Sequence, residues 1–330
     1  MAKKSKRGSG PRPGGNRAER VAARKERQAA AMAPPPRPFA GLAAECDLVA
    51  LRSFVASATA VLDLVEPGAP APVLTANVPS DEVPATPPAR PAGVRNDVVV
   101  ATILPGAVPA LVRENPRIGA EGMVGLQTDP EPTDLPGSLA DAIDWAAHAN
   151  AGADYRPAGT EQTLTDLIAP DSTLDITVYD DFAWWFAEGT DVPAEVAAML
   201  QRANDSIMPT ARLTPKSGLG APWWVDAGER AHLRWVRPEA EDDLMTALAR
   251  LHAAGQLTLG EGSRFAGSFR THGLLVPVFD LDNELHHEEW YPGVDQFDEW
   301  LAQALSQTGE LTGAERRSRD GIRGRQVTLR

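Results

Sequence analysis

Apolar side chains recur along the chain at helical and at strand spacing. Positions three and four residues apart share one face of a helix, whereas alternate positions share one face of a strand. The helical spacing predicts five helices, in chain order through Leu48, Leu51 and Val55; Leu139, Ile143 and Ala147; Val196, Leu200, Ala203 and Ile207; Leu244, Leu248 and Leu251; and Val294, Phe297, Leu301 and Leu305. We expect Asp47 to cap the first of these helices, Pro193 to begin the third and Gly255 to end the fourth.

Short apolar runs and alternating stretches predict the strands. The continuous run at 98–104 is typical of a strand that is buried on both faces. Asn115-Pro116 and Asp226-Ala227-Gly228 are turn signals between neighbouring strands, and Pro277 favours an edge or a bulge position. The predicted strands are 60–65, 98–104, 110–112, 123–127, 174–178, 223–225, 231–236, 257–259, 264–270 and 274–279.

These elements predict an α+β fold with two antiparallel-sheet/helix halves and disordered basic termini. Strands and helices do not alternate regularly enough for a doubly wound parallel sheet. The expected organisation is a disordered Pro/Ala/Arg-rich tail at 1–36, a first half at 37–150 with a Pro-rich insertion or linker at 67–93, a second half at 151–311, and a basic C-terminal segment at 312–330. Within that segment, Thr312 and Glu315 form a capping-box pattern that predicts a helix.

Charge is divided sharply along the chain. The formal net charge is −13, but residues 1–38 carry +9, residues 39–314 carry −26 and residues 315–330 carry +4. We expect the basic arms to behave independently of the acidic body and to contact RNA, DNA or the ribosome through phosphates. The alternative is that the arms only solvate the chain or lie on its own body. The expected contacts are Lys3, Lys4, Lys6, Arg7, Arg24, Lys25 and Arg27.

Several classes of protein are disfavoured by what the sequence lacks. One cysteine allows no disulfide within the chain, and no apolar stretch is long enough to span a membrane. There is no Gly-Lys dipeptide for a Walker A loop, and the glycine-rich stretch at 259–267 does not have dinucleotide-binding spacing. The basic start lacks the apolar core of a secretory signal. We therefore expect a cytoplasmic protein without a cofactor and without a membrane partner.

An acidic turn gives the clearest candidate for metal-assisted chemistry. Asp280 and Asp282 follow a predicted strand, and His286 and His287 come soon after. Carboxylates placed in this way can hold a divalent cation. However, adjacent histidines point apart, and the spacing fits neither an EF-hand nor an H-x-x-x-H motif. An exposed acidic turn is the favoured interpretation, and a metal-assisted enzyme remains an alternative to a non-enzymatic protein.

Other polar and aromatic residues offer weaker candidates. Four basic side chains lie on or beside predicted strands and would form an anion cleft if they converged: His232, Arg234, Arg270 and His272. In Trp184-Trp185 and Trp223-Trp224, an extended backbone would leave one ring of each pair exposed. Such rings, with Trp185 and Trp224 as the candidates, would suit a protein–protein adaptor. Cys46 lies between two acids and is interpreted as an ordinary buried thiol.

Several sequence blocks occur together in one known family. They are RPFAGL (37–42), DLVALR (47–52), ATILP (101–105), ALVR (110–113), VGLQ (124–127), HLRWV (232–236), ALARLHAAG (247–255), LGEGSRFAGSFRTHGLLVPVFDL (259–281) and GIRGRQVTLR (321–330). Over about 37–330 the chain resembles an uncharacterised family of actinobacterial proteins that carries a domain of unknown function. The resemblance implies no established activity, so it assigns no functional residue.

Overall fold

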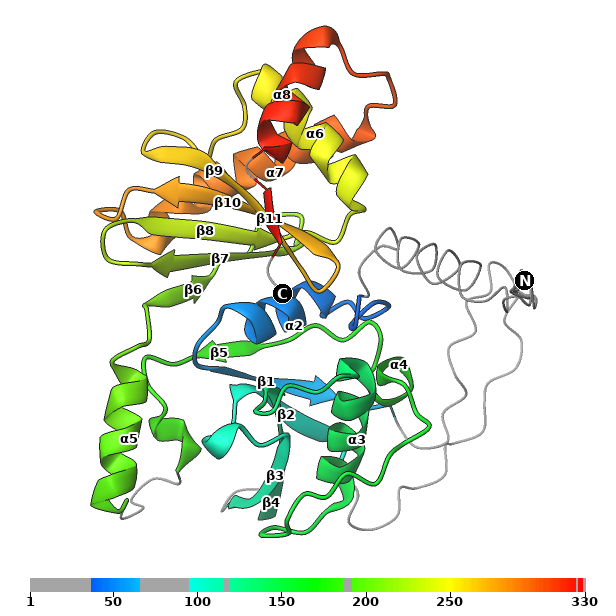
Figure 1. The fold of residues 1–330 in the computed structure, drawn as a ribbon, viewed down its shortest axis with the longest axis vertical. Coiled ribbons are helices and arrows are strands. Elements are labelled where there is room, and N and C mark those ends of the chain that lie inside the picture. The colour runs from blue at the N-terminus through cyan, green and yellow to red at the C-terminus, as the bar shows by residue number, and fades with distance from the viewer. Residues whose placement is uncertain (1–36, 66–94, 116–118, 187–191, 325, 329–330) are drawn as a thin grey trace, which may run out of the picture. The chain divides into compact units, whose positions relative to one another are not determined.

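A mixed five-stranded sheet, called the first sheet, occupies the N-terminal part of the fold (Figure 1). The computed structural model describes residues 37–65, 95–115, 119–186, 192–324 and 326–328. The sheet has the order β3-β4-β2-β1-β5, and all its pairs are antiparallel except β2 with β4. Its strands are β1 (Ala58–Asp63), β2 (Asp97–Ile103), β3 (Ala110–Asn115), β4 (Gly119–Gln127) and β5 (Ile176–Val178).

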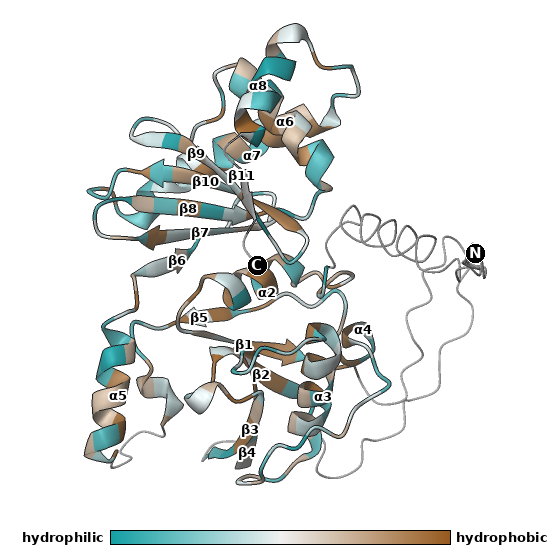
Figure 2. Cartoon of the chain, in the orientation of Figure 1, coloured by the Kyte–Doolittle hydropathy of each residue, from teal (hydrophilic) through white to brown (hydrophobic). Residues whose placement is uncertain are grey.

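The apolar pattern of the strands explains which of them is central. In Figure 2, β1 and β2 are coloured largely as hydrophobic. The predicted buried strand is confirmed as β2, where Val98, Val100 and Ala101 are almost completely buried. Two helices pack on this sheet, α2 (Glu45–Ser53) and α3 (Leu135–His148). One hydrophobic core joins them to the strands.

The second sheet has the order β11-β9-β10-β8-β7-β6, and it is antiparallel except for the pair β11 with β9. Helices α6 (Glu241–Ala253) and α7 (Tyr291–Ser306) cover one face, and α8 (Gly313–Arg323) packs on α6. The strands are β6 (Thr210–Arg212), β7 (Ala221–Asp226), β8 (Ala231–Val236), β9 (Ser263–Thr271), β10 (Leu274–Leu281) and β11 (Gln326–Thr328).

Helix α2 links the two sheets. It contacts β2 and β4 of the first sheet and β7 and β8 of the second. The same core therefore contains Leu48 and Leu51 of α2, and also Trp223 and Val276 of the second sheet. All described residues belong to one compact unit, Arg37–Arg330.

The remaining elements are short or peripheral. They are α4 (Leu164–Leu167), α5 (Ala194–Asn204) and the 3₁₀ turns η1 (Pro105–Ala107), η2 (Ala183–Trp185) and η3 (His287–Trp290). Helix α5 contains no buried residue, although its apolar positions follow a helical pattern. Among the described residues, we find no helix that is both long and apolar enough to cross a membrane.

The α+β class is confirmed, as are the five predicted helices and the capping box of Thr312 and Glu315. The tail at 1–36 and the whole of the insertion at 67–93 lie outside the described residues. The expectation that the C-terminal segment behaves independently of the body is wrong. Helix α8 packs on α6, with Ile322 only 3 % exposed.

Two local predictions are also wrong, and a third is confirmed only in part. Asp47 lies inside α2, whose N-cap is Ala44. Residues 257–259 form no strand; Leu257 and Leu259 are buried from a turn-rich segment instead. Pro277 lies in the central strand β10 rather than at an edge, but the register shifts one residue later. That irregularity is the bulge that proline favours.

Candidate functional site

Asp280, the first acid of the predicted acidic turn, lies at the centre of a cluster of charged side chains on the second sheet. The register of the second sheet places it opposite His232 of β8 and Arg264 of β9. Its Oδ2 lies 2.6 Å from Nη2 of Arg264 and 3.4 Å from Nη1 of Arg230, and its Oδ1 lies 3.2 Å from Nδ1 of His232. Asp280, Arg230 and Arg264 are among the residues that line a shallow cavity of about 330 Å³, whereas His232 is not.

The cluster is arranged to neutralise one carboxylate. Burial alone raises the pKa of Asp280, but the hydrogen bond from Arg264 and the nearby charges of His232, Arg264 and Arg230 together lower it below its ordinary value. Arg230 and Arg264 have side chains that are 60 % and 71 % exposed, so solvent screens both pairs. A cation that bound Asp280 would have to displace these partners.

Of the other acidic-turn candidates, Asp282 lines the same cavity as Asp280, but the hydrogen bond that it accepts is a local one. Asp282 accepts a hydrogen bond from the backbone N–H of Glu284 at 3.0 Å, which closes a local turn. His286 caps η3, and His287 packs against Trp224 at 5.7 Å between ring centroids. In the described ranges no group of three or more His, Cys, Asp or Glu side chains could hold a metal ion.

The four predicted anion-cleft residues divide between two faces of the sheet and a turn. His232 and Arg234 share one face of β8, and the Arg234 guanidinium lies 5.4 Å from the Phe54 ring centroid. Burial lowers the pKa of Arg234. Arg270 lies on the other side and pairs with Glu241 of α6. His272 occupies the β9–β10 turn at φ +45°.

The predicted exposed tryptophans are also corrected. Trp223 is 1 % exposed and Trp224 is 7 % exposed, because the two faces of β7 contribute to different cores. Trp184 and Trp185 are half-buried, and their indole N–H groups donate to Ser57 Oγ and to the Ile103 carbonyl. Neither pair therefore presents one free ring.

Cys46 is buried in α2, as the sequence predicts. Burial, followed by the charges of Glu45 and Asp47, raises the pKa of its thiol to about 12. Such a thiol is a poor nucleophile at neutral pH because the reactive form is the thiolate.

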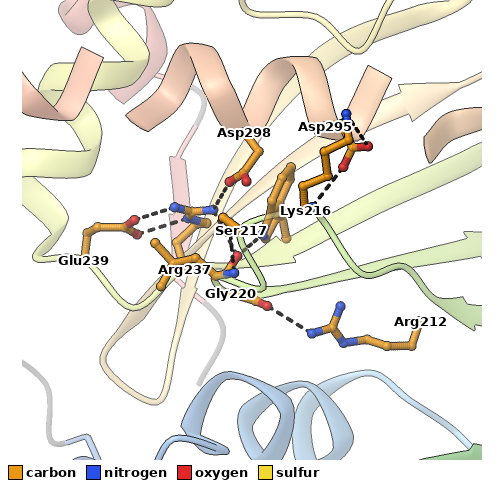
Figure 3. Close-up of polar contacts among 10 residues, drawn as sticks. Arg212, Lys216, Ser217, Gly220, Arg237, Glu239, Asp295 and Asp298 are labelled. Atoms are coloured by element: carbon orange, nitrogen blue, oxygen red, sulfur yellow. Dashed lines mark hydrogen bonds and ion pairs between the residues drawn. The ribbon is translucent and has the colours of Figure 1, made fainter. Parts of the chain in front are cut away.

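A buried ion network around Arg237 has no signal in the sequence beyond a single Arg after a strand. Arg237 is 1 % exposed. It donates to Glu239, to the Leu219 carbonyl at 3.2 Å and to Asp298 of α7 at 3.4 Å (Figure 3). Lys216 pairs with Asp295 of the same helix at 3.5 Å. These contacts hold the 213–220 segment against α7, so the network positions the fold and touches no cavity described above.

The basic segments differ in what the structure describes. Residues 1–36 lie outside it, whereas α8 carries exposed Arg316, Arg317 and Arg323. Arg323 pairs with Asp242 at 2.9 Å, and Arg316 donates to the Leu311 carbonyl at 2.5 Å. Part of the positive charge of α8 is therefore engaged with the body.

Comparison with known proteins identifies one family. The model of a family of unknown function (DUF5926) matches residues 38–89 and 73–330. No curated protein and no solved structure matches the chain.

Proposed function

We propose that this chain, which belongs to the family of unknown function DUF5926, is a cytoplasmic, non-enzymatic protein that contacts nucleic acid or the ribosome through basic segments. The observation that carries the proposal is the segregation of charge. Residues 1–38 carry +9, and residues 39–314 carry −26. A basic segment attached to an acidic body gains phosphate contacts by counterion release, while the body is repelled by phosphate.

The N-terminal segment contributes most to this proposed role. Four of its basic residues, Lys3, Lys4, Lys6 and Arg7, fall within five consecutive positions of the sequence. In α8, by contrast, Arg323 already pairs with Asp242. We therefore assign α8 a smaller contribution, made by Arg316 and Arg317.

The two alternatives have less support from the described residues. A metal-assisted enzyme at Asp280 and Asp282 would need those carboxylates to act together, yet Asp280 already has cationic partners and Asp282 closes a turn. An adaptor that used Trp224 would need that ring to leave the core.

The experiment compares two full-length variants with equal net charge. In the first, Lys3, Lys4, Lys6 and Arg7 are replaced by Gln; in the control, the exposed Arg156, Arg202, Lys216 and Arg230 are replaced by Gln. Binding to fluorescent single-stranded RNA and duplex DNA is followed by anisotropy between about 50 and 200 mM salt, and ribosome binding by co-sedimentation.

We expect the first variant to bind RNA, DNA or ribosomes more weakly and to lower the slope of log K against log salt by up to about 3–4, because up to four phosphate contacts are lost. The control should bind like wild type. Equal binding by all three proteins would refute the proposal, as would a loss in the control alone.

A further inference from the structure

A cavity of about 350 Å³ opens beside the N-terminal half of α3, remote in sequence from the basic segments. Its walls come from Pro109 before β3, the end of β4, the segment that follows β4, the first turns of α3 and the segment after α3. That volume lies within the range of sites that hold small molecules. The wall is largely apolar and includes Leu126, Leu135 and four prolines.

The buried acidic group at this cavity is the carboxylate of Asp141. The residue is only 8 % exposed although its side chain is a carboxyl group. Its Oδ2 accepts a hydrogen bond from the Tyr155 hydroxyl at 2.6 Å, and its Oδ1 accepts one from the Ala158 backbone N–H at 3.3 Å. A carboxylate offers about four acceptor positions, so about half of its capacity is available to a ligand.

The positive charge that a buried carboxylate needs is missing among the described residues. None of the residues that line the cavity is Lys, Arg or His, and Asp141 takes part in none of the ion pairs of the described chain. Buried charges are normally paired, because an unpaired one is costly to desolvate. The second acid at the wall, Asp134, caps α3 by accepting from the Gly137 N–H.

Tyr155 holds the Asp141 carboxylate in position. Burial and the hydrogen bond to Asp141 raise the pKa of the tyrosine hydroxyl, so it stays protonated and acts as a donor. The Tyr155 ring is itself held edge-on by Trp145 at 5.3 Å between centroids. The carboxylate is thus pre-organised, which lowers the entropic cost of binding a ligand.

We propose that this cavity binds a small organic cation, a protonated amine carried on an apolar body, with Asp141 as its counter-ion. The ammonium group supplies the missing positive charge and donates to the free acceptor positions of Asp141. The apolar body lies against the proline and leucine wall. The proposal stands apart from the nucleic-acid role, which concerns other residues and the opposite charge.

Three probes of similar size and different charge test the inference on the full chain: benzylamine, benzyl alcohol and benzoate. Binding is measured by ligand-observed NMR and by calorimetry. We expect benzylamine to bind at least about tenfold more tightly than benzyl alcohol, because a charge-assisted hydrogen bond is worth more than a neutral one. Benzoate should not bind. Equal binding of benzylamine and benzyl alcohol, or no binding of benzylamine, would overturn the proposal.

Variants separate this site from the general attraction of an acidic body for cations. Asp141→Asn removes the carboxylate and keeps an acceptor for the Tyr155 hydroxyl. Asp144→Asn is the matched control, because it makes the same change on the same helix at a side chain that is 39 % exposed. We expect benzylamine affinity to fall at least about tenfold in Asp141→Asn and to stay unchanged in Asp144→Asn. Equal loss in both variants would contradict the proposal.

A second variant covers the case in which Asp141→Asn does not fold. Ser138→Leu places a larger side chain at the half-buried cavity wall and leaves the carboxylate intact. It should abolish benzylamine binding while far-ultraviolet circular dichroism shows a folded chain. Retained affinity in folded Ser138→Leu would place the amine elsewhere and overturn the assignment.

Discussion

Arg212 and Asp47 are 165 positions apart in the sequence, yet Nε of Arg212 donates to Oδ1 of Asp47 at 2.6 Å. Arg212 ends β6 in the second sheet, and Asp47 lies in α2. Their side chains are only 17 % and 19 % exposed. The pair therefore ties α2 to the second sheet where solvent screening is reduced.

This ion pair should contribute measurably to folding stability. We expect Arg212→Met to lower the free energy of unfolding by about 2–4 kcal/mol and Asp47→Ala by about 1–2 kcal/mol. The arginine costs more because it also donates to the carbonyls of Leu213 and Gly220. Urea unfolding measures both values. The double variant should show coupling of at least about 0.5 kcal/mol, whereas strict additivity, or an equal loss in Arg202→Met on exposed α5, would contradict the pairing.

Two glycines of the 213–220 segment, Gly218 and Gly220, should differ in how they tolerate an added methyl group. Gly218 and Gly220 both have positive φ, at +70° and +75°. A Cβ at Gly220 would lie 2.6 Å from the Val236 carbonyl oxygen, whereas a Cβ at Gly218 would meet nothing within 4 Å. We expect Gly218→Ala to cost about 1–2 kcal/mol from backbone strain, and Gly220→Ala at least about 1 kcal/mol more from the clash. Equal midpoints in chemical denaturation would show that the segment moves to accept the methyl group.

Cys46 should be inert in the folded protein. With a thiol pKa of about 12, only about one molecule in ten thousand carries the thiolate near pH 8. We expect iodoacetamide to leave the native chain unmodified over hours and to label it rapidly in guanidinium chloride. Mass spectrometry follows the reaction. Native labelling at the rate of the unfolded chain would show that the thiol is neither buried nor suppressed by Glu45 and Asp47.

His272 should make the fold less stable as the solution becomes acidic. Burial, followed by the charge of Arg52, lowers its pKa, and Glu131 opposes the shift only in part. The unfolded chain therefore binds the proton more readily, so stability falls as pH drops below the unfolded value of about 6.5 toward the folded pKa.

The test compares urea midpoints at about pH 7.5 and at about pH 5.5. Asparagine tolerates a positive φ, so His272→Asn can keep the turn. This variant should lose less stability on acidification than wild type. An unchanged acid sensitivity in His272→Asn would rule out this histidine as the source.

The local spacing of apolar residues predicted the helices and strands, whereas contacts between segments distant in sequence determined which of their faces are buried. Helix α7 was predictable because Val294, Phe297 and Leu301 recur at helical spacing. The structure shows that all three are buried. Strand alternation predicted one exposed tryptophan in β7, but α2 covers one face and α7 the other. No sequence window contains both of those helices.

The candidate sites show the same division. The acidic turn predicted Asp280 as a candidate site residue. The side chains that Asp280 contacts come from β8 and β9, and they depend on the register of the strands. No local pattern predicts a role for Asp141, because a single acid in a helical segment looks the same in sequence as a solvated one. Its burial depends on Tyr155, which lies in an irregular segment after α3.

The position of α2 between two sheets has a consequence during protein synthesis. Ser53 ends this helix, and β8, one of its partners, ends at Val236. At about 5–20 residues per second, the roughly 180 intervening residues take on the order of 10–40 s to emerge. For that interval the face of α2 that will meet the second sheet has no native cover, and transiently exposed apolar surface of this kind makes an incompletely folded chain prone to aggregate.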